Sequence, residues 1–126
     1  MVTAIVIPMT PARVLSPNAR THWATKARAV ARFRDAAHLS TTVTMPADER
    51  DALQRCQSIG YVVRVSWERG RRGSIDEDNV LASCKAALDG VADALGIDDR
   101  RFHVRGVEID RTSRAGTTTI TLTRED

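Results

Sequence analysis

An apolar stripe with helical spacing between residues 78 and 95 constrains the fold more than any other feature of the sequence. At about 100° per residue, one side of such a helix carries Val80, Leu81, Cys84, Ala87, Leu88, Val91 and Leu95. A stripe of this width must be buried against another layer of structure. Gly96 then favours a helix end. The stretch therefore predicts one long helix, from about Asp78 to Leu95, that packs on the core.

β-Branched and aromatic residues indicate strands elsewhere in the chain. The predicted strands cover 3–8, 60–68, 102–112 and 116–124. The turn at 113–116 should join the last two strands as a hairpin. The opening segment MVTAIVIPM lacks a basic stretch and a small-residue cleavage pattern, so we expect a strand there and not a signal peptide.

Two more helices are expected before the second strand. One covers 21–39, with Thr21 as a candidate N-cap, and another starts at about Pro46. The core-facing side of the first should be Trp23, Ala27, Val30, Phe33 and Ala37. The order of elements predicts a mixed α/β (α+β) fold, one small domain over residues 1–126. Its mixed sheet should have about four strands, packed by two to three helices.

Composition limits the compartment and the class of partner. A chain of 126 residues, 42% of them hydrophobic, suits one globular domain. No run approaches the roughly 18 apolar residues of a membrane span. Cys56 and Cys84 lack the spacing of a zinc site, which favours a reducing compartment. We therefore expect a cytoplasmic protein without a membrane partner.

Basic residues gather in two stretches although the net charge is only +3. The first has no acid and contains Arg13, Arg20, Lys26, Arg28, Arg32 and Arg34. The second surrounds an acidic cluster and contains Arg64, Arg69, Arg71, Arg72 and Lys85. A basic surface around acidic residues suits a polyanion together with a metal ion, and a solvated charged face is the alternative.

The acidic cluster lies at the start of the long predicted helix. Asp76, Glu77 and Asp78 stand there, and Lys85 and Asp89 follow within about 20° of Asp78 around the helix axis. Ordinary helix chemistry offers one explanation: Asp76 or Asp78 as an N-cap, and Lys85 and Asp89 as an i,i+4 pair. Asp98 and Asp99 would then be turn residues.

A divalent-metal site is the functional explanation of the same residues. Mg²⁺ prefers oxygen ligands and is usually held by a few carboxylates, which Asp76, Asp78 and one of Asp98 and Asp99 could supply. Such a metal activates water and offsets the charge of a scissile phosphate, while Lys85 would stabilise the transition state. The sequence lacks the ligand pattern of an EF-hand loop, a P-loop and the GxSxG motif.

The stretch DEDNVLASCKAALDGVADALGIDD resembles the central motif of the RusA-type Holliday-junction resolvases, especially those of bacteriophages and prophages. That motif contains DxDN, a lysine that opens KxxxD, an alanine-rich helix and a terminal DD. The earlier LSPNARTHWATKARAVARFRDAA is similar to the family's N-terminal segment. In this chain the gap between Asn79 and Lys85 is longer than in the best-known form, by about one helical turn.

The resemblance implies a small homodimer that uses Mg²⁺ or Mn²⁺ to cut four-way DNA junctions. It implies metal-binding carboxylates at Asp76, Asp78 and Asp99, with Lys85 as the catalytic lysine. Asn79, Asp89 and Asp98 would be supporting residues, and Asp98 is also an alternative ligand to Asp99. The DNA-binding residues expected from the basic stretches are Arg20, Lys26, Arg28, Arg32, Arg34, Arg69, Arg71 and Arg72.

Two further functions compete with this expectation. One is a non-catalytic DNA-binding module that keeps the fold and the basic surface. The other is a metal-dependent nuclease or phosphatase that acts on a different substrate. The acids favour an enzyme, because carboxylates beside phosphates are repulsive in a module that only binds DNA. Trp23 and Trp67 could stack on bases, although we expect both in the core.

Overall fold

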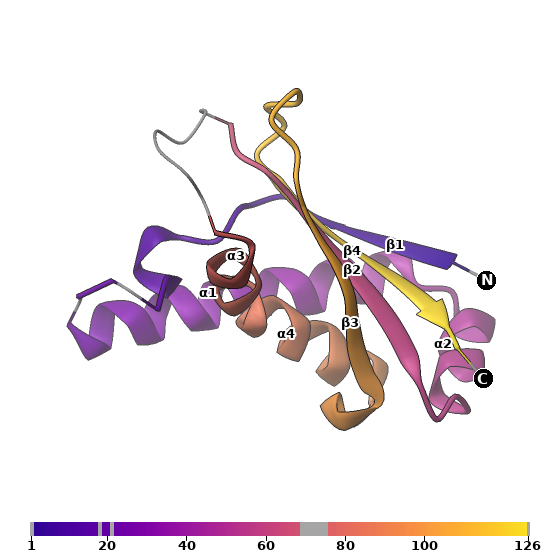
Figure 1. Ribbon diagram of the computed structural model, residues 1–126. Helices are drawn as coiled ribbons and strands as arrows, with labels where there is room; N and C mark the ends of the chain where they lie inside the picture. The colour runs from indigo at the N-terminus through magenta and orange to yellow at the C-terminus, as the bar shows by residue number, and fades with distance from the viewer. Residues whose placement is uncertain (1, 18, 21, 69–75, 126) are drawn as a thin grey trace.

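The computed structural model describes residues 2–17, 19–20, 22–68 and 76–125 (Figure 1). Within them, four strands form one sheet: β1 (Val2–Ile7), β2 (Ile59–Ser66), β3 (Phe102–Ile109) and β4 (Thr117–Arg124). The α-helices are α1 (Trp23–Thr44), α2 (Ala47–Gln54), α3 (Glu77–Ser83) and α4 (Lys85–Leu95). Two 3-10 helices are η1 (Arg13–Leu15) and η2 (Asp99–Arg101). The predicted mixed α/β class and four-stranded sheet are confirmed.

The sheet is mixed, with the strand order β1-β4-β2-β3. β4 pairs antiparallel with β1 and with β2, while β3 pairs parallel with β2. The predicted hairpin between β3 and β4 is therefore wrong. A parallel pair needs a long crossover, and α3 and α4 supply it between β2 and β3. β3 thus takes one side of β2, and β4 adds to the other.

One face of the sheet is covered by helices, and Figure 1 shows α1 and α4 on that side. Side chains alternate accordingly along β1 and β4. The largest fully buried side chains, from the sheet and from the helices over it, are Phe33, Ile5, Ile7, Leu53, Ile59, Leu95, Ile120, Leu122, Val63, Val65, Val80 and Val91.

 On the opposite face of the sheet, Val2 and Val6 are exposed.

The helical layer rests on close packing between α1 and α4. Phe33 and Ala37 of α1 are buried, and so are Ala87 and Val91 of α4. Gly90 lies at a close approach of the two helices, because a Cβ there would overlap the Arg34 carbonyl oxygen and come 3.1 Å from the Ala37 Cβ. The apolar stripe predicted for residues 80–95 is confirmed, since all of its members are buried or half-buried.

The start of α1 differs from the prediction. His22 occupies the N-cap position, and the predicted cap Thr21 lies outside the described residues. Trp23 was expected in the core but is 76% exposed, and Ala27 is also exposed. Figure 1 shows the reason, because this end of α1 extends away from the sheet. Trp67, by contrast, is half-buried and packs against the core.

None of the described helices combines the length and the apolar character that crossing a bilayer requires.

Candidate functional site

The acidic cluster begins at the N-terminus of α3, where Asp76 is the N-cap. Its Oδ1 accepts a hydrogen bond from the Asp78 backbone N–H at 2.9 Å. Glu77 and Asp78 occupy the first turn, where acids are favoured by the helix dipole. All three side chains are exposed. The expected capping role is confirmed, and it leaves the carboxylate of Asp76 with capacity for other partners.

The predicted single helix from Asp78 to Leu95 is wrong, because the chain breaks at Cys84 into α3 and α4. Cys84 has φ −95° and ψ 1°, and its N–H donates to the carbonyl oxygens of Val80 and Leu81, each at 3.1 Å. The side chain is 2% exposed, and burial raises the pKa of its thiol to about 12. The break is thus fixed in the core, and Lys85 directly follows it.

Lys85 and Asp78 line the same cavity in spite of the break. This cavity, of about 390 Å³, is otherwise lined by Tyr61, Val63, Leu81, Ala82, Cys84 and Leu88. The ammonium group of Lys85 lies 3.7 Å from Asp89 Oδ1, which confirms the expected i,i+4 pair. Lys85 is 72% exposed, so this pair contributes little to stability.

Lys85 also borders a second cavity, of about 380 Å³, between the start of α1 and the α3–α4 break. Lys26 lines it from α1, and Asp89 lines it from α4. Two ammonium groups and one carboxylate thus share a space whose remaining lining is mostly apolar. Its chemistry suits an anion with an apolar portion.

Asp98 and Asp99 lie after α4, on either side of the start of η2. Asp98 is the N-cap of η2, and its carboxylate accepts from Arg100 N at 3.0 Å and from Arg100 Nη2 at 2.9 Å. The Arg100 guanidinium holds the pKa of Asp98 well below its usual range. Asp99 and Asp98 line a cavity of about 270 Å³ together with Asp89, Asp93 and Arg34. The expected turn role is thus confirmed for Asp98.

The structure therefore brings the predicted residues together in two groups. Asp78 and Lys85 line one cavity, with Asp76 next to Asp78 at the start of α3, while Asp98 and Asp99 lie at the far end of α4. Asp89 connects them, because it pairs with Lys85 and lines the cavity of Asp98 and Asp99. Within the described part of the chain, no three His, Cys, Asp or Glu side chains are placed to hold one metal ion. The three-carboxylate site stays a prediction.

The predicted basic face of α1 is divided around the helix. Arg20, Lys26, Arg28 and Arg32 are all exposed, but at about 100° per residue Arg28 lies roughly 160° from Lys26 around the axis. Arg34 pairs with Asp93 of α4, and its Nε lies 3.0 Å from Asp93 Oδ2. This hydrogen bond raises the pKa of Arg34. Arg69, Arg71 and Arg72 lie outside the described residues.

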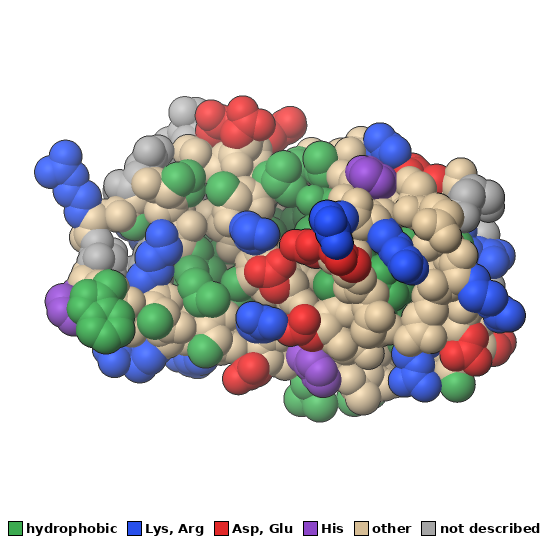
Figure 2. All heavy atoms as spheres, turned by 90° about the horizontal axis from the view of Figure 1, so that it is seen from below, with side chains coloured by type: hydrophobic (Ala, Val, Ile, Leu, Met, Phe, Trp, Pro, Cys, Tyr) green, Lys and Arg blue, Asp and Glu red, His purple; other side chains and the backbone are tan. Residues whose placement is uncertain are grey.

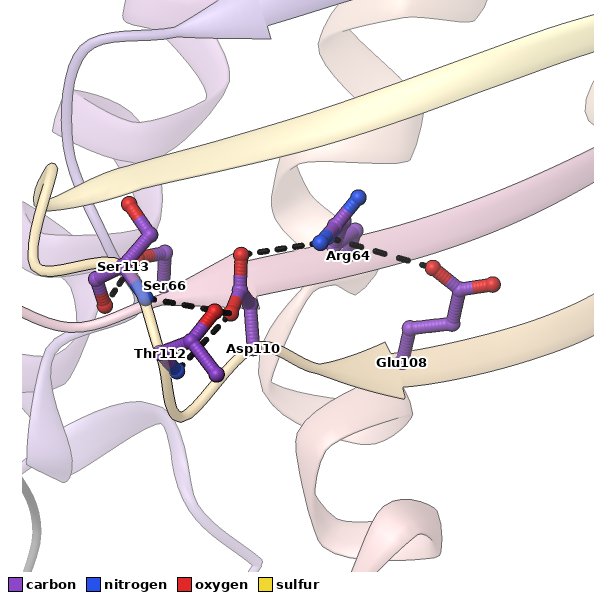
Figure 3. Close-up of polar contacts among 6 residues, drawn as sticks. All are labelled: Arg64, Ser66, Glu108, Asp110, Thr112 and Ser113. Atoms are coloured by element: carbon purple, nitrogen blue, oxygen red, sulfur yellow. Dashed lines mark hydrogen bonds and ion pairs between the residues drawn. The ribbon is translucent and has the colours of Figure 1, made fainter.

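A polar network at the end of β3 has no counterpart in the sequence predictions (Figure 3). Asp110 Oδ1 accepts from Thr112 N at 2.9 Å, from Thr112 Oγ1 at 2.7 Å and from Ser113 N at 3.1 Å. Its Oδ2 accepts from Arg64 Nη2 at 2.9 Å. These bonds, with the Thr112 hydroxyl first, lower the pKa of Asp110 to about 2. The network joins the loop after β3 to β2, and the DxTS pattern was its only sequence signal.

Comparison with known proteins identifies a relative, whose name does not state an activity. No family model matches the chain. A protein of Xylella fastidiosa strain Temecula1, named "Uncharacterized protein", is 36% identical over 119 residues. The match covers 90% of this chain and 71% of the relative.

Proposed function

For this chain, which belongs to the same family as the Xylella fastidiosa protein, we propose a metal-dependent endodeoxyribonuclease that resolves four-way DNA junctions in the cytoplasm. One observation supports this proposal above the others. Asp78 and Lys85 line one cavity at the α3–α4 break, and Asp76 precedes Asp78 at the same helix end. Paired carboxylates beside a lysine suit phosphodiester hydrolysis.

The residues at this helix end fit a hard divalent cation. Mg²⁺ typically takes one or two protein carboxylates and fills its other positions with water and phosphate oxygens. Asp76 and Asp78 would hold Mg²⁺ or Mn²⁺, because both are exposed and Asp76 uses Oδ1 alone to cap the helix. When bound, the ion supplies charge neutralisation at the scissile phosphate and an activated water.

The neighbouring side chains have separate roles in the proposal. Lys85 donates hydrogen bonds to the phosphate oxygens, where negative charge grows in the transition state. Asp89 holds the ammonium group in place through the 3.7 Å pair, and Asn79 supports the same helix turn. Asp99 is the better third ligand than Asp98, because Arg100 already occupies the Asp98 carboxylate.

DNA contact and assembly complete the proposal. Arg20, Lys26, Arg28 and Arg32 are exposed and would bind phosphates, and Arg69, Arg71 and Arg72 would add to them. Symmetric resolution needs two nicks in opposing strands, so a two-fold homodimer with one site in each copy matches the junction.

A non-catalytic DNA-binding module is the second candidate. The division of the carboxylates into two groups favours it, because the described residues hold no three-ligand cluster. A metal-dependent nuclease or phosphatase with another substrate is a third candidate, which shares the residues around Lys85.

One experiment distinguishes these three candidate functions. The protein is incubated with a synthetic four-way junction and with a linear duplex, each with and without Mg²⁺. The proposal predicts paired nicks in the junction alone, and only with the metal. Equal cutting of the linear duplex would remove junction selectivity. Binding of the junction without nicks under any metal condition would leave the DNA-binding module.

A further inference from the structure

Trp23 is an exposed aromatic side chain at the first position of α1. It is 76% exposed, although a tryptophan normally buries a large apolar area in a core or an interface. Trp67 is half-buried and packs against the core. The exposure of Trp23 is therefore a local property of the start of α1, where the helix leaves the sheet (Figure 1).

The imidazole ring of His22 packs beside the indole ring of Trp23. The two ring centroids are 5.6 Å apart, and the ring planes are inclined by 30°. His22 Nδ1 accepts a hydrogen bond from the Ala24 N–H at 3.2 Å, which ties the imidazole to the first turn of the helix. The indole thus rests against a ring that is itself attached to the backbone, and it loses less freedom when a ligand stacks on it.

The charges around Trp23 are basic. Arg20 and Lys26 are exposed, and residues 13–34 contain no acid. Figure 2 shows this end of the molecule on the left, and the charged side chains seen there are basic. Lys26 also lines the cavity that contains Lys85. Basic side chains therefore lead from Trp23 to the cavity at the α3–α4 break, where Asp89 adds one carboxylate.

We propose that Trp23, supported by His22, is a stacking platform for an unpaired nucleobase, and that Arg20 and Lys26 bind the phosphates on either side of that base. Exposed aromatic rings beside basic groups are how proteins bind single-stranded nucleic acid. The inference deepens the proposed function, on which it rests only for the choice of nucleic acid as ligand. It places an unpaired segment of the DNA beside the site of cleavage.

Fluorescence of Trp23 tests the platform without metal or cleavage. In a Trp67→Phe variant, Trp23 is the remaining tryptophan, and titration with an oligo(dT) strand should quench its emission. An abasic strand of the same length offers phosphates but no bases, so it should leave the emission nearly unchanged. If Trp67→Phe does not fold, the change in Trp23 emission is obtained as the difference between the wild-type and Trp23→Phe signals.

Affinity supplies an independent readout. Trp23→Ala should weaken oligo(dT) binding by about tenfold or more, and Trp23→Phe should restore most of it, because a phenyl ring still stacks. Lys26→Ala should weaken binding without a change in the maximal quench. Val43→Ala is a matched control, since Val43 is a 77% exposed apolar residue on the same helix, and its variant should bind like the wild type.

Equal quenching by the abasic strand, or unchanged affinity of Trp23→Ala, would overturn the platform. A Trp23 emission that shifts with protein concentration in the absence of DNA would also overturn it, and would assign Trp23 to a contact between copies of the chain. Absence of nicking together with base-dependent quenching would refute the nuclease and keep the platform. Nicking without base-dependent quenching would refute the platform and keep the nuclease.

Discussion

Asp76 combines a helix cap with a negative charge, and substitution can separate the two. Asp76→Ala removes both and should lower the free energy of unfolding by about 1 kcal/mol. Asp76→Asn keeps the capping oxygen that now accepts from Asp78 N, and asparagine caps about as well as aspartate, so its stability should stay within a few tenths of a kcal/mol. Urea unfolding measures both values. An equal decrease in the free energy of unfolding of the two variants would contradict the capping role.

Lys85 should matter for catalysis and hardly for stability. Lys85→Ala should slow junction nicking by about 10²–10³-fold, as expected for the loss of one donor to the transition state. Its free energy of unfolding should change by less than about 0.5 kcal/mol, because the pair with Asp89 is exposed. Lys26→Ala is the control, since Lys26 lines the same cavity and should affect DNA binding but not nicking at saturating DNA. Equal nicking rates for both variants would contradict the assignment.

Asp110 should make the fold sensitive to acid. Its pKa is about 2 in the folded chain and about 3.9 in an unfolded one. A depressed folded pKa gives stability that is present above about pH 4 and is lost as the pH falls through about 2. Asp110→Asn should therefore lower Tm more at pH 6 than at pH 2. Glu108→Gln is the control, because Glu108 lies 3.9 Å from Arg64 and is 61% exposed. If the difference in Tm between the wild type and Asp110→Asn does not shrink at low pH, the depressed pKa of Asp110 is contradicted.

Side-chain roles could be predicted where they depend on neighbours in the sequence. The capping role of Asp76 and the Lys85–Asp89 pair both follow from spacing within four residues, and both are confirmed. The exposure of Trp23 could not be predicted this way. Helical periodicity gives the side of α1 that faces inward, but not how far the helix extends beyond the layer it covers.

At the scale of elements, Gly90 permits the close approach of α1 and α4. Gly90→Ala should destabilise the protein by about 1–2 kcal/mol, because the added methyl overlaps the Arg34 carbonyl and outweighs the better helix propensity of alanine. Thermal or urea unfolding measures the change. Gly106→Ala is the control, since its Cβ would meet Val62 at an ordinary 3.7 Å, and it should stay within about 0.5 kcal/mol. A Gly90→Ala variant as stable as the wild type would contradict the close approach.

The elements themselves were predictable, but their connections were less so. Each strand has enough β-branched residues to be found from local pattern. The break at Cys84 and the partner of β3 depend on tertiary packing. The short turn before β4 indicated a hairpin, yet the α3–α4 crossover places β3 parallel to β2 and sends β4 to the other side.

At the scale of the whole molecule, the sequence predicted one set of site residues, and the structure divides this set into two groups. One continuous helix would place the acids from both ends along one line. The break at Cys84 and the engagement of Asp98 by Arg100 instead leave two groups with Asp89 between them. The metal therefore belongs with Asp76 and Asp78 in our proposal, and Asp99 is the ligand that most needs a test.

The rate of strand nicking by Asp78→Asn, measured on a saturating four-way junction with Mg²⁺, tests the proposed function most directly. The substitution removes one charge at an exposed position and keeps the size of the side chain. We predict that nicking is abolished while junction affinity is unchanged or tighter, because a carboxylate that repels phosphate is lost. Nicking at the wild-type rate would show that the carboxylates of α3 do not hold the catalytic metal.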